Sequence, residues 1–151
     1  MLDRFSDDER SRIGVHTCPG GDQDSTHSAE VDSSALLPTL FELRAGAFYL
    51  ELAGESAPEA VLEVVRGNLK PGPRVFVGVT DPIDPNVETP EQVRDRVLLA
   101  AEYLPLAQLG TTDDCGFSPF GDDVSTARET AFAKIRARVQ GTELAAARLG
   151  A

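Results

Sequence analysis

The chain has 151 residues, 41% of them hydrophobic, which is the length and composition of one ordinary folded domain. Its 25 acidic residues against 14 basic ones give a formal net charge of −11, so it lacks the basic surface that neutralises phosphates, which argues against nucleic acid as a partner. No apolar run approaches the ~20 residues of a membrane helix, and the acidic N-terminus is unlike a signal peptide. We therefore expect a soluble, cytoplasmic protein.

The first half of the chain has the pattern of a short helix followed by a strand, a helix and a second strand. Leu2–Arg12 is predicted to form the short helix, and the brief apolar segment Ile13–Cys18, which Pro-Gly-Gly ends, is predicted to form a strand. Beyond a polar loop, apolar residues at helical spacing predict a helix over Leu36–Ala45. The apolar run Ala47–Ala53 then predicts the second strand.

The second half of the chain repeats this alternation. Pro58 opens a helix whose apolar face extends to Leu69, and the continuous apolar run Arg74–Thr80 predicts a strand buried on both faces. A proline-rich loop leads into a predicted helix over Pro90–Leu104. A shorter fourth strand is expected within Gln108–Cys115.

A long helical segment ends the chain, and we expect Ser125 or Thr126 to cap it. Four strands joined by connections long enough for crossovers predict an α/β fold with a parallel sheet. A complete β/α barrel needs eight strands and about 250 residues, so the pattern corresponds to half a barrel. An open four-stranded sheet is the alternative.

Residues that could carry chemistry fall where the predicted strands end. His16 and Cys18 are two residues apart on one strand, so their side chains point to the same side. In parallel α/β folds the loops after the strands meet at one face, which brings further polar residues beside this pair. These residues are Glu51, Asp81, Asp113, Asp114 and Cys115.

One nitrogen, two sulfurs and a carboxylate form a ligand set that suits zinc, with Glu51 as the expected fourth ligand. Other roles for these residues remain open at this point. Glu51 could pair with Arg44 or Arg74, and His16 could be a buried core histidine. The two cysteines could be small buried hydrophobes, or they could form a disulfide.

Four stretches of the sequence resemble the cobalamin-independent methionine synthase family, in particular its shorter, single-barrel branch. They are "IGVHTCPGGDQDSTH", "FYLELA", "VFVGVTDPIDPNVETPEQV" and "LGTTDDCGFSPF", and together they extend over nearly the whole chain. They look like successive strand ends in the C-terminal half of that family's TIM (β/α)8 barrel. The resemblance implies that residues 1–151 form such a C-terminal half-barrel without the N-terminal half.

The resemblance also implies a zinc ion held by His16, Cys18, Glu51 and Cys115. In the family, zinc binds the thiol of homocysteine, and the sulfur takes a methyl group from a methylated folate or, in some branches, from a corrinoid protein. The expected function is therefore that of a zinc-dependent S-methyltransferase in methionine biosynthesis. The missing half implies a truncated or split protein, or a partner chain that supplies the other half-barrel.

Two departures from the family pattern leave alternatives open. Ile83 stands where full methionine synthases carry a histidine, which puts proton delivery by that loop in doubt. The short branch is also similar to zinc enzymes that transfer an epoxide-derived alkyl group to coenzyme M, so another thiol acceptor is an alternative. A non-catalytic zinc-binding fragment is a further alternative function, because much of the family's substrate-binding surface lies in the absent half.

Overall fold

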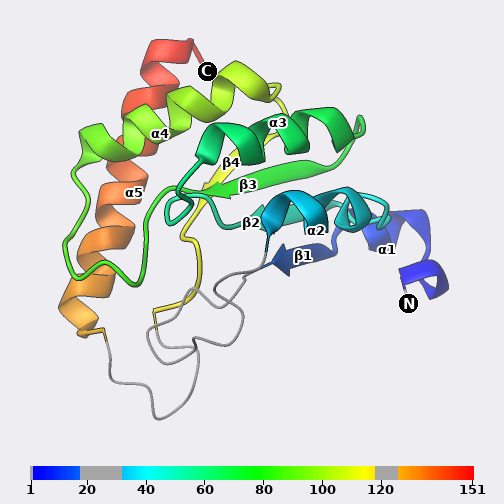
Figure 1. The fold of residues 1–151 in the computed structure, drawn as a ribbon, viewed down its shortest axis with the longest axis horizontal. Coiled ribbons are helices and arrows are strands. Elements are labelled where there is room, and N and C mark those ends of the chain that lie inside the picture. The colour runs from blue at the N-terminus through cyan, green and yellow to red at the C-terminus, as the bar shows by residue number, and fades with distance from the viewer. Residues whose placement is uncertain (1, 18–31, 118–125) are drawn as a thin grey trace.

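The computed structural model describes residues 2–17, 32–117 and 126–151, and these ranges contain one four-stranded sheet with helices packed against it (Figure 1). The strands pair in the order β1-β2-β3-β4, and every pair is parallel. Their bounds are Gly14–Thr17 (β1), Ala47–Leu50 (β2), Arg74–Gly78 (β3) and Leu109–Thr112 (β4). The predicted α/β class with parallel βα units is thus confirmed.

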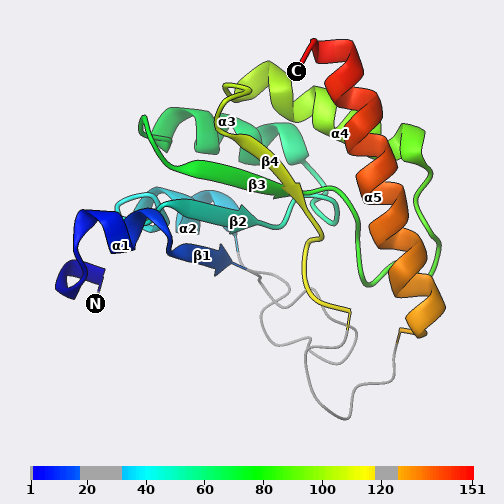
Figure 2. The ribbon, with the colours of Figure 1, turned by 180° about the vertical axis from the view of Figure 1, so that it is seen from behind.

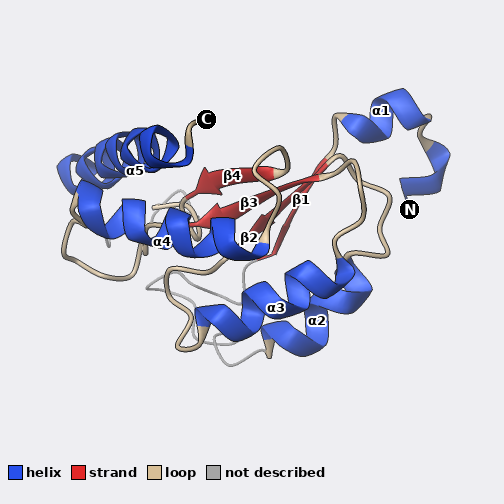
Figure 3. Cartoon of the chain, turned by 90° about the horizontal axis from the view of Figure 1, so that it is seen from above, coloured by secondary structure: helices blue, strands red, loops and turns tan. Residues whose placement is uncertain are grey.

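The helices are arranged mainly on one side of this sheet. α2 and α3 lie in front of the strands in Figure 1 and behind them in Figure 2, and α5 packs along α4. Seen from above, α2, α3 and α4 form one layer beneath the strands (Figure 3). The helices are η1 (Leu2–Arg4), α1 (Asp7–Ser11), α2 (Ser33–Leu40), α3 (Pro58–Asn68), α4 (Pro90–Tyr103) and α5 (Arg128–Leu149).

The sequential strand order distinguishes the two architectures that the sequence left open. A doubly wound open sheet reverses its strand order and places helices on both faces. Here each strand pairs with the next one along the chain, and right-handed crossovers then place successive helices on the same face. That is the winding of a β/α barrel, of which these four strands form an arc.

The alternation of side chains along the strands separates a core face from an open face. Phe48, Leu50, Val75 and Val77 point toward the helices and are buried. The next residue in each strand points the other way, so the open face carries His16, Tyr49, Phe76 and Gly110, which the strand register places side by side. In a closed barrel this open face would be the interior.

Capping explains where α4 begins. Thr89 accepts a hydrogen bond from the backbone N–H of Gln92, the Gln92 side chain accepts one from the Thr89 N–H, and Pro90 occupies the first turn. The observed bounds, Pro90–Tyr103, agree with the prediction to within one residue.

Two helix ends differ from the predictions. The expected helix Leu36–Ala45 is α2, Ser33–Leu40, because Asp32 accepts the Ser34 N–H at 2.9 Å and so starts the helix earlier. The expected cap of the last helix by Thr126 is wrong, since α5 begins at Arg128 without a side-chain cap, and Ser125 lies outside the described residues.

Candidate functional site

His16 lies in β1, is exposed, and pairs in register with Tyr49 of β2. The interpretation of His16 as a buried core histidine is therefore wrong. Cys18, the second member of the predicted pair, lies outside the described residues. Thr17, the last residue of β1, pairs with Leu50, the last residue of β2. In the sequence, Cys18 follows Thr17 and Glu51 follows Leu50.

Glu51 directly follows β2 and is half-buried, and its Oε2 atom is buried without a hydrogen-bond partner. The expected pairing with Arg44 or Arg74 is wrong. Arg44 forms an ion pair with Asp7 at 2.7 Å, and Arg74 lies over the Phe76 ring, 4.9 Å from its centroid. An unpaired buried carboxylate oxygen is costly, so a cation or a proton at this position would stabilise the folded chain.

Burial, together with the negative charges of Asp114, Glu55 and Asp81, raises the pKa of Glu51 to about 7. Glu51 is therefore about half ionised at neutral pH. A bound divalent cation would favour the ionised form.

Asp114 is almost completely buried and accepts three backbone hydrogen bonds from the loop that follows β2. Its Oδ1 accepts the N–H groups of Leu52 and Ala53 at 2.9 Å each, and its Oδ2 accepts that of Gly54 at 2.7 Å. Burial raises the pKa of Asp114 to about 6, although the three hydrogen bonds oppose this shift. One carboxylate thus joins the end of β4 to the end of β2.

Three carboxylates converge beside Gly54. A Cβ atom built on this glycine would lie 3.2 Å from Oε1 of Glu51, 3.4 Å from Oδ2 of Asp114 and 3.9 Å from Oδ2 of Asp81. The carboxyl ends of β2, β3 and β4 therefore form an acidic cluster, as the parallel sheet predicts. Repulsion within such a cluster favours a cation.

Cys115 follows Asp114, is half-buried and is disulfide-bonded in the structure, which is the alternative to a metal ligand that the sequence left open. Within the described ranges, no group of three or more His, Cys, Asp or Glu side chains has the geometry of a metal site. One of the four predicted ligands, Cys18, lies outside those ranges. The zinc site therefore stays a prediction.

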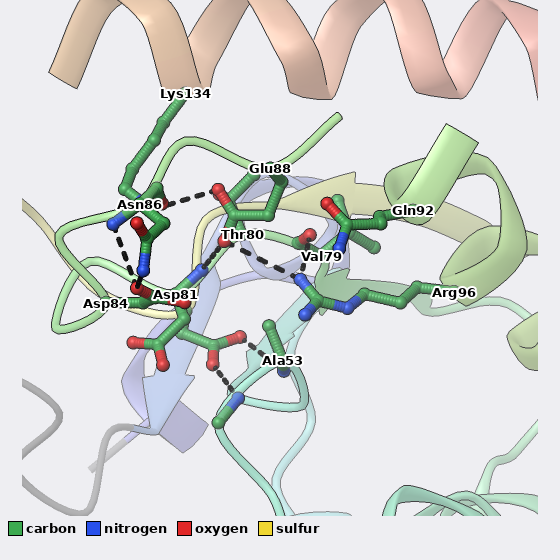
Figure 4. A network of polar contacts seen from close by, with 12 residues as sticks. Ala53, Val79, Thr80, Asp81, Asp84, Asn86, Glu88, Gln92, Arg96 and Lys134 are labelled. Atoms are coloured by element: carbon green, nitrogen blue, oxygen red, sulfur yellow. Dashed lines mark hydrogen bonds and ion pairs between the residues drawn. The ribbon is translucent and has the colours of Figure 1, made fainter. Parts of the chain in front are cut away.

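The loop after β3 is fixed by a buried network that the sequence did not reveal (Figure 4). Glu88 accepts a hydrogen bond from the backbone N–H of Asp81 at 2.7 Å. It also forms an ion pair with Lys134 of α5 at 2.9 Å. Lys134, fully buried, also donates to the carbonyl of Asn86 at 2.5 Å, and Arg96 of α4 donates to that of Val79 at 2.8 Å. Two helices thus hold Asp81 at the strand ends.

The same loop carries Ile83, which is 40% exposed. Its N–H donates to Oδ1 of Asp81 at 2.8 Å, so the loop turns back on Asp81. The sequence of this loop, residues 81–88, contains no histidine.

Sequential parallel strands with polar side chains at their carboxyl ends are the arrangement that β/α barrels use. No protein-family model matches the chain, and no curated protein matches it in sequence. Among solved structures it is similar to a B12-independent methionine synthase from Shewanella sp. W3-18-1 in complex with selenomethionine, with a TM-score of 0.71 and 22% identity.

This similarity covers 98% of the present chain and 45% of the Shewanella chain. The chain therefore spans less than half the length of that protein. At 22% identity the similarity establishes the fold, and it supports the arc of a β/α barrel that the strand order indicates.

Proposed function

We propose that residues 1–151 form the C-terminal half of a β/α-barrel domain like that of the B12-independent methionine synthases, and that the strand ends hold zinc for methyl transfer to the thiol of homocysteine. The observation that carries the proposal is Glu51. It lies at the predicted ligand position with a buried, unpartnered oxygen, and two more carboxylates lie beside it. The similarity in fold to the Shewanella methionine synthase supports the same assignment.

The donor set fits zinc chemically. We assign His16, Cys18, Glu51 and Cys115 as the ligands, which supply nitrogen, sulfur and oxygen donors of the kinds that zinc binds. When bound, zinc favours the thiolate form of a coordinated thiol at neutral pH and so makes the substrate sulfur nucleophilic. Both cysteines must be reduced for this role.

The residues of the chain have distinct tasks in this proposal. Glu51, half-buried, would be an oxygen ligand that a substrate thiol could displace or join. Asp81 and Asp114 would add negative charge that attracts the cation without binding it directly. A methylated folate is the proposed methyl donor, and most of its binding surface would belong to the absent half-barrel.

Metal binding is tested on the full chain, reduced and freed of metal, by competition with a chromophoric zinc chelator. We expect one zinc per chain, and a loss of affinity of at least a hundredfold in Cys115→Ser and in His16→Ala. Glu59→Gln, an exposed glutamate in the first turn of α3, serves as the matched control and should bind as the wild type does. Stoichiometry far below one, unchanged by Cys115→Ser, would contradict the proposal.

Catalysis is tested by methionine formation from homocysteine and methylated folate, with the chain alone and with a co-expressed N-terminal half-barrel. Activity only with the supplied half would support a split enzyme. Zinc binding without activity in either case would favour a non-catalytic zinc-binding fragment.

The thiol acceptor is tested by comparing homocysteine with coenzyme M in one assay. Ile83, in place of the family's histidine, is the observation that favours another acceptor or alkyl donor. Reaction with homocysteine alone would reject that alternative.

A further inference from the structure

Asp114 connects two of the three strand ends that carry proposed zinc ligands, those of β2 and β4. Along the chain it directly precedes Cys115, and its carboxylate accepts the N–H groups of residues 52–54, which directly follow Glu51. Only 1% of Asp114 is exposed; its hydrogen bond with Leu52 is buried, and those with Ala53 and Gly54 are partly buried.

The packing of β3 makes room for this carboxylate. A Cβ atom built on Gly78 would lie 1.6 Å from Oδ1 of Asp114, so any larger residue at position 78 would displace the side chain. Gly78 pairs in register with Thr112, two residues before Asp114. Gly78 of β3 therefore leaves the space through which the Asp114 carboxylate, after β4, reaches the loop after β2.

A carboxylate is an expensive choice for a purely structural role here. Burial disfavours its charge, and Glu51 and Asp81 bring like charges close to it. The three N–H groups offset part of this cost by charge-assisted hydrogen bonds. A divalent cation held by Glu51 would offset more of it, so this charge suits a site that is occupied by a metal.

We propose that Asp114 is a positioning residue of this site: it fixes the backbone of residues 52–54 so that Glu51 projects over the strand ends toward the metal. The inference rests on the proposed zinc site. Partners of metal ligands typically change metal affinity by about 10- to 100-fold when they are removed.

The first test uses metal-free protein. It measures the protection of the backbone amides of residues 52–54 by hydrogen exchange, and it measures the carboxyl ¹³C chemical shift of Glu51. In Asp114→Asn one oxygen becomes an NH2 donor that faces backbone donors. We expect residues 52–54 to lose at least tenfold in protection, and the Glu51 signal to move toward that of an exposed glutamate. Unchanged protection and an unchanged Glu51 signal would overturn the proposal.

Asp113→Asn is the matched control. It makes the same chemical change one residue away, where Asp113 pairs with Arg138 at 3.1 Å and not with the loop after β2. We expect protection of residues 52–54 to stay within about threefold of the wild type. An equal loss in Asp113→Asn would indicate general loosening and would overturn a specific role for Asp114.

The second test is a double-mutant cycle on zinc affinity with Asp114→Asn and Glu51→Gln. Asp114→Asn alone should weaken zinc binding by about tenfold or more. In the Glu51→Gln background the same change should have an effect of less than about threefold, because Asp114 acts through Glu51. A full, additive loss in both backgrounds would contradict the proposal.

A second variant covers the case in which Asp114→Asn does not fold. Gly78→Ala displaces the carboxylate but keeps its charge, and we expect it to cause the same loss of protection in residues 52–54. If the wild type binds no zinc, the proposed function fails. Hydrogen exchange and the Glu51 signal then decide alone whether Asp114 positions Glu51.

Discussion

Glu51 differs from an ordinary surface carboxylate in its burial and in its pKa. Its Oε2 atom is buried without a partner, and its neighbours in space are other acids. An acid whose pKa is raised by folding favours the protonated form in the native state. Its contribution to stability is therefore fully present below the unfolded pKa and is lost as the pH rises through the folded pKa.

We predict that Glu51→Gln stabilises the metal-free chain at high pH. The pKa of Glu51 rises from 4.5 to about 7 on folding, so the wild type loses stability between about pH 4.5 and pH 7. For a half-exposed group, solvent screening reduces the effect to about 1 kcal/mol. Chemical denaturation at pH 5 and pH 8 should show a gain for Glu51→Gln at pH 8 only. An equal gain at both pH values, or in the exposed control Glu59→Gln, would contradict the interpretation.

Lys134 is the residue through which α5 holds the loop after β3. It is fully buried, and Glu88, its ion-pair partner, is 7% exposed. The Glu88 carboxylate also accepts the Asp81 N–H, and Arg96 lies 3.6 Å from it. Loss of Lys134 would leave a buried carboxylate with weaker compensation.

We predict that Lys134→Met destabilises the chain by about 3 kcal/mol, because removing one partner of a buried pair leaves the other charge uncompensated. The double variant Lys134→Met with Glu88→Gln should recover part of this loss, since no buried charge then remains unpaired. The free energies of unfolding in urea measure both. A double variant less stable than Lys134→Met would contradict the explanation.

At the scale of elements, the longest helix–helix contact is that between α4 and α5, and Gly141 allows it. A Cβ atom built on Gly141 would lie 2.4 Å from the Cβ of Val93 and 2.6 Å from the carbonyl oxygen of Pro90. The two helices could not accommodate a side chain here without separating. In contrast, nothing lies within 4 Å of a Cβ built on Gly67 near the end of α3.

The two helical glycines therefore predict opposite effects of the same substitution. Gly141→Ala should destabilise the chain by about 1–3 kcal/mol through overpacking. Gly67→Ala should stabilise it by about 0.5–1 kcal/mol, because alanine has the higher helix propensity. Thermal unfolding followed by circular dichroism checks both, and a stabilised Gly141→Ala would contradict the packing described here.

At the scale of the whole molecule, the sheet has two unpaired edges, β1 and β4, within the described residues. Its open face carries the stacked rings of Tyr49 and Phe76, with centroids 4.7 Å apart. Unpaired parallel edges and half-buried aromatic rings are unfavourable in isolation. None of the described helices is long and apolar enough to cross a membrane.

We predict that the chain binds a polypeptide that carries a complementary four-stranded half-barrel. α5 presents Phe132 and Val139, 54% and 49% exposed and two helical turns apart, and these residues would be covered. Light scattering on co-expressed halves should show a 1:1 complex that Phe132→Ser with Val139→Ser weakens. Leu36→Ser on α2, exposed to 41%, is the control, and an equal effect of Leu36→Ser would contradict the assigned interface.

The sequence by itself determined the succession of elements. Apolar periods of two and of about 3.6 residues, with proline and glycine between them, identified four strands and the helices that join them, and α4 to within one residue. It also placed His16 and Glu51 at strand ends, because strand parity and parallel topology are readable from local spacing. The second and third strands end at Leu50 and Gly78, earlier than predicted, and α5 begins without a side-chain cap; these patterns indicate neither.

Only the tertiary structure decided how the strand ends are connected. Asp114 lies 60 to 62 residues from the N–H groups that it accepts, and Lys134 lies 46 residues from Glu88. Neither pairing leaves a periodic signal in the sequence. The first depends on the register of the non-adjacent strands β2 and β4, and the second depends on the packing of α5, which lies at the far end of the chain. Local periodicity specifies which face of an element is apolar, whereas the contacts between loops exist only after the sheet has brought the strand ends together.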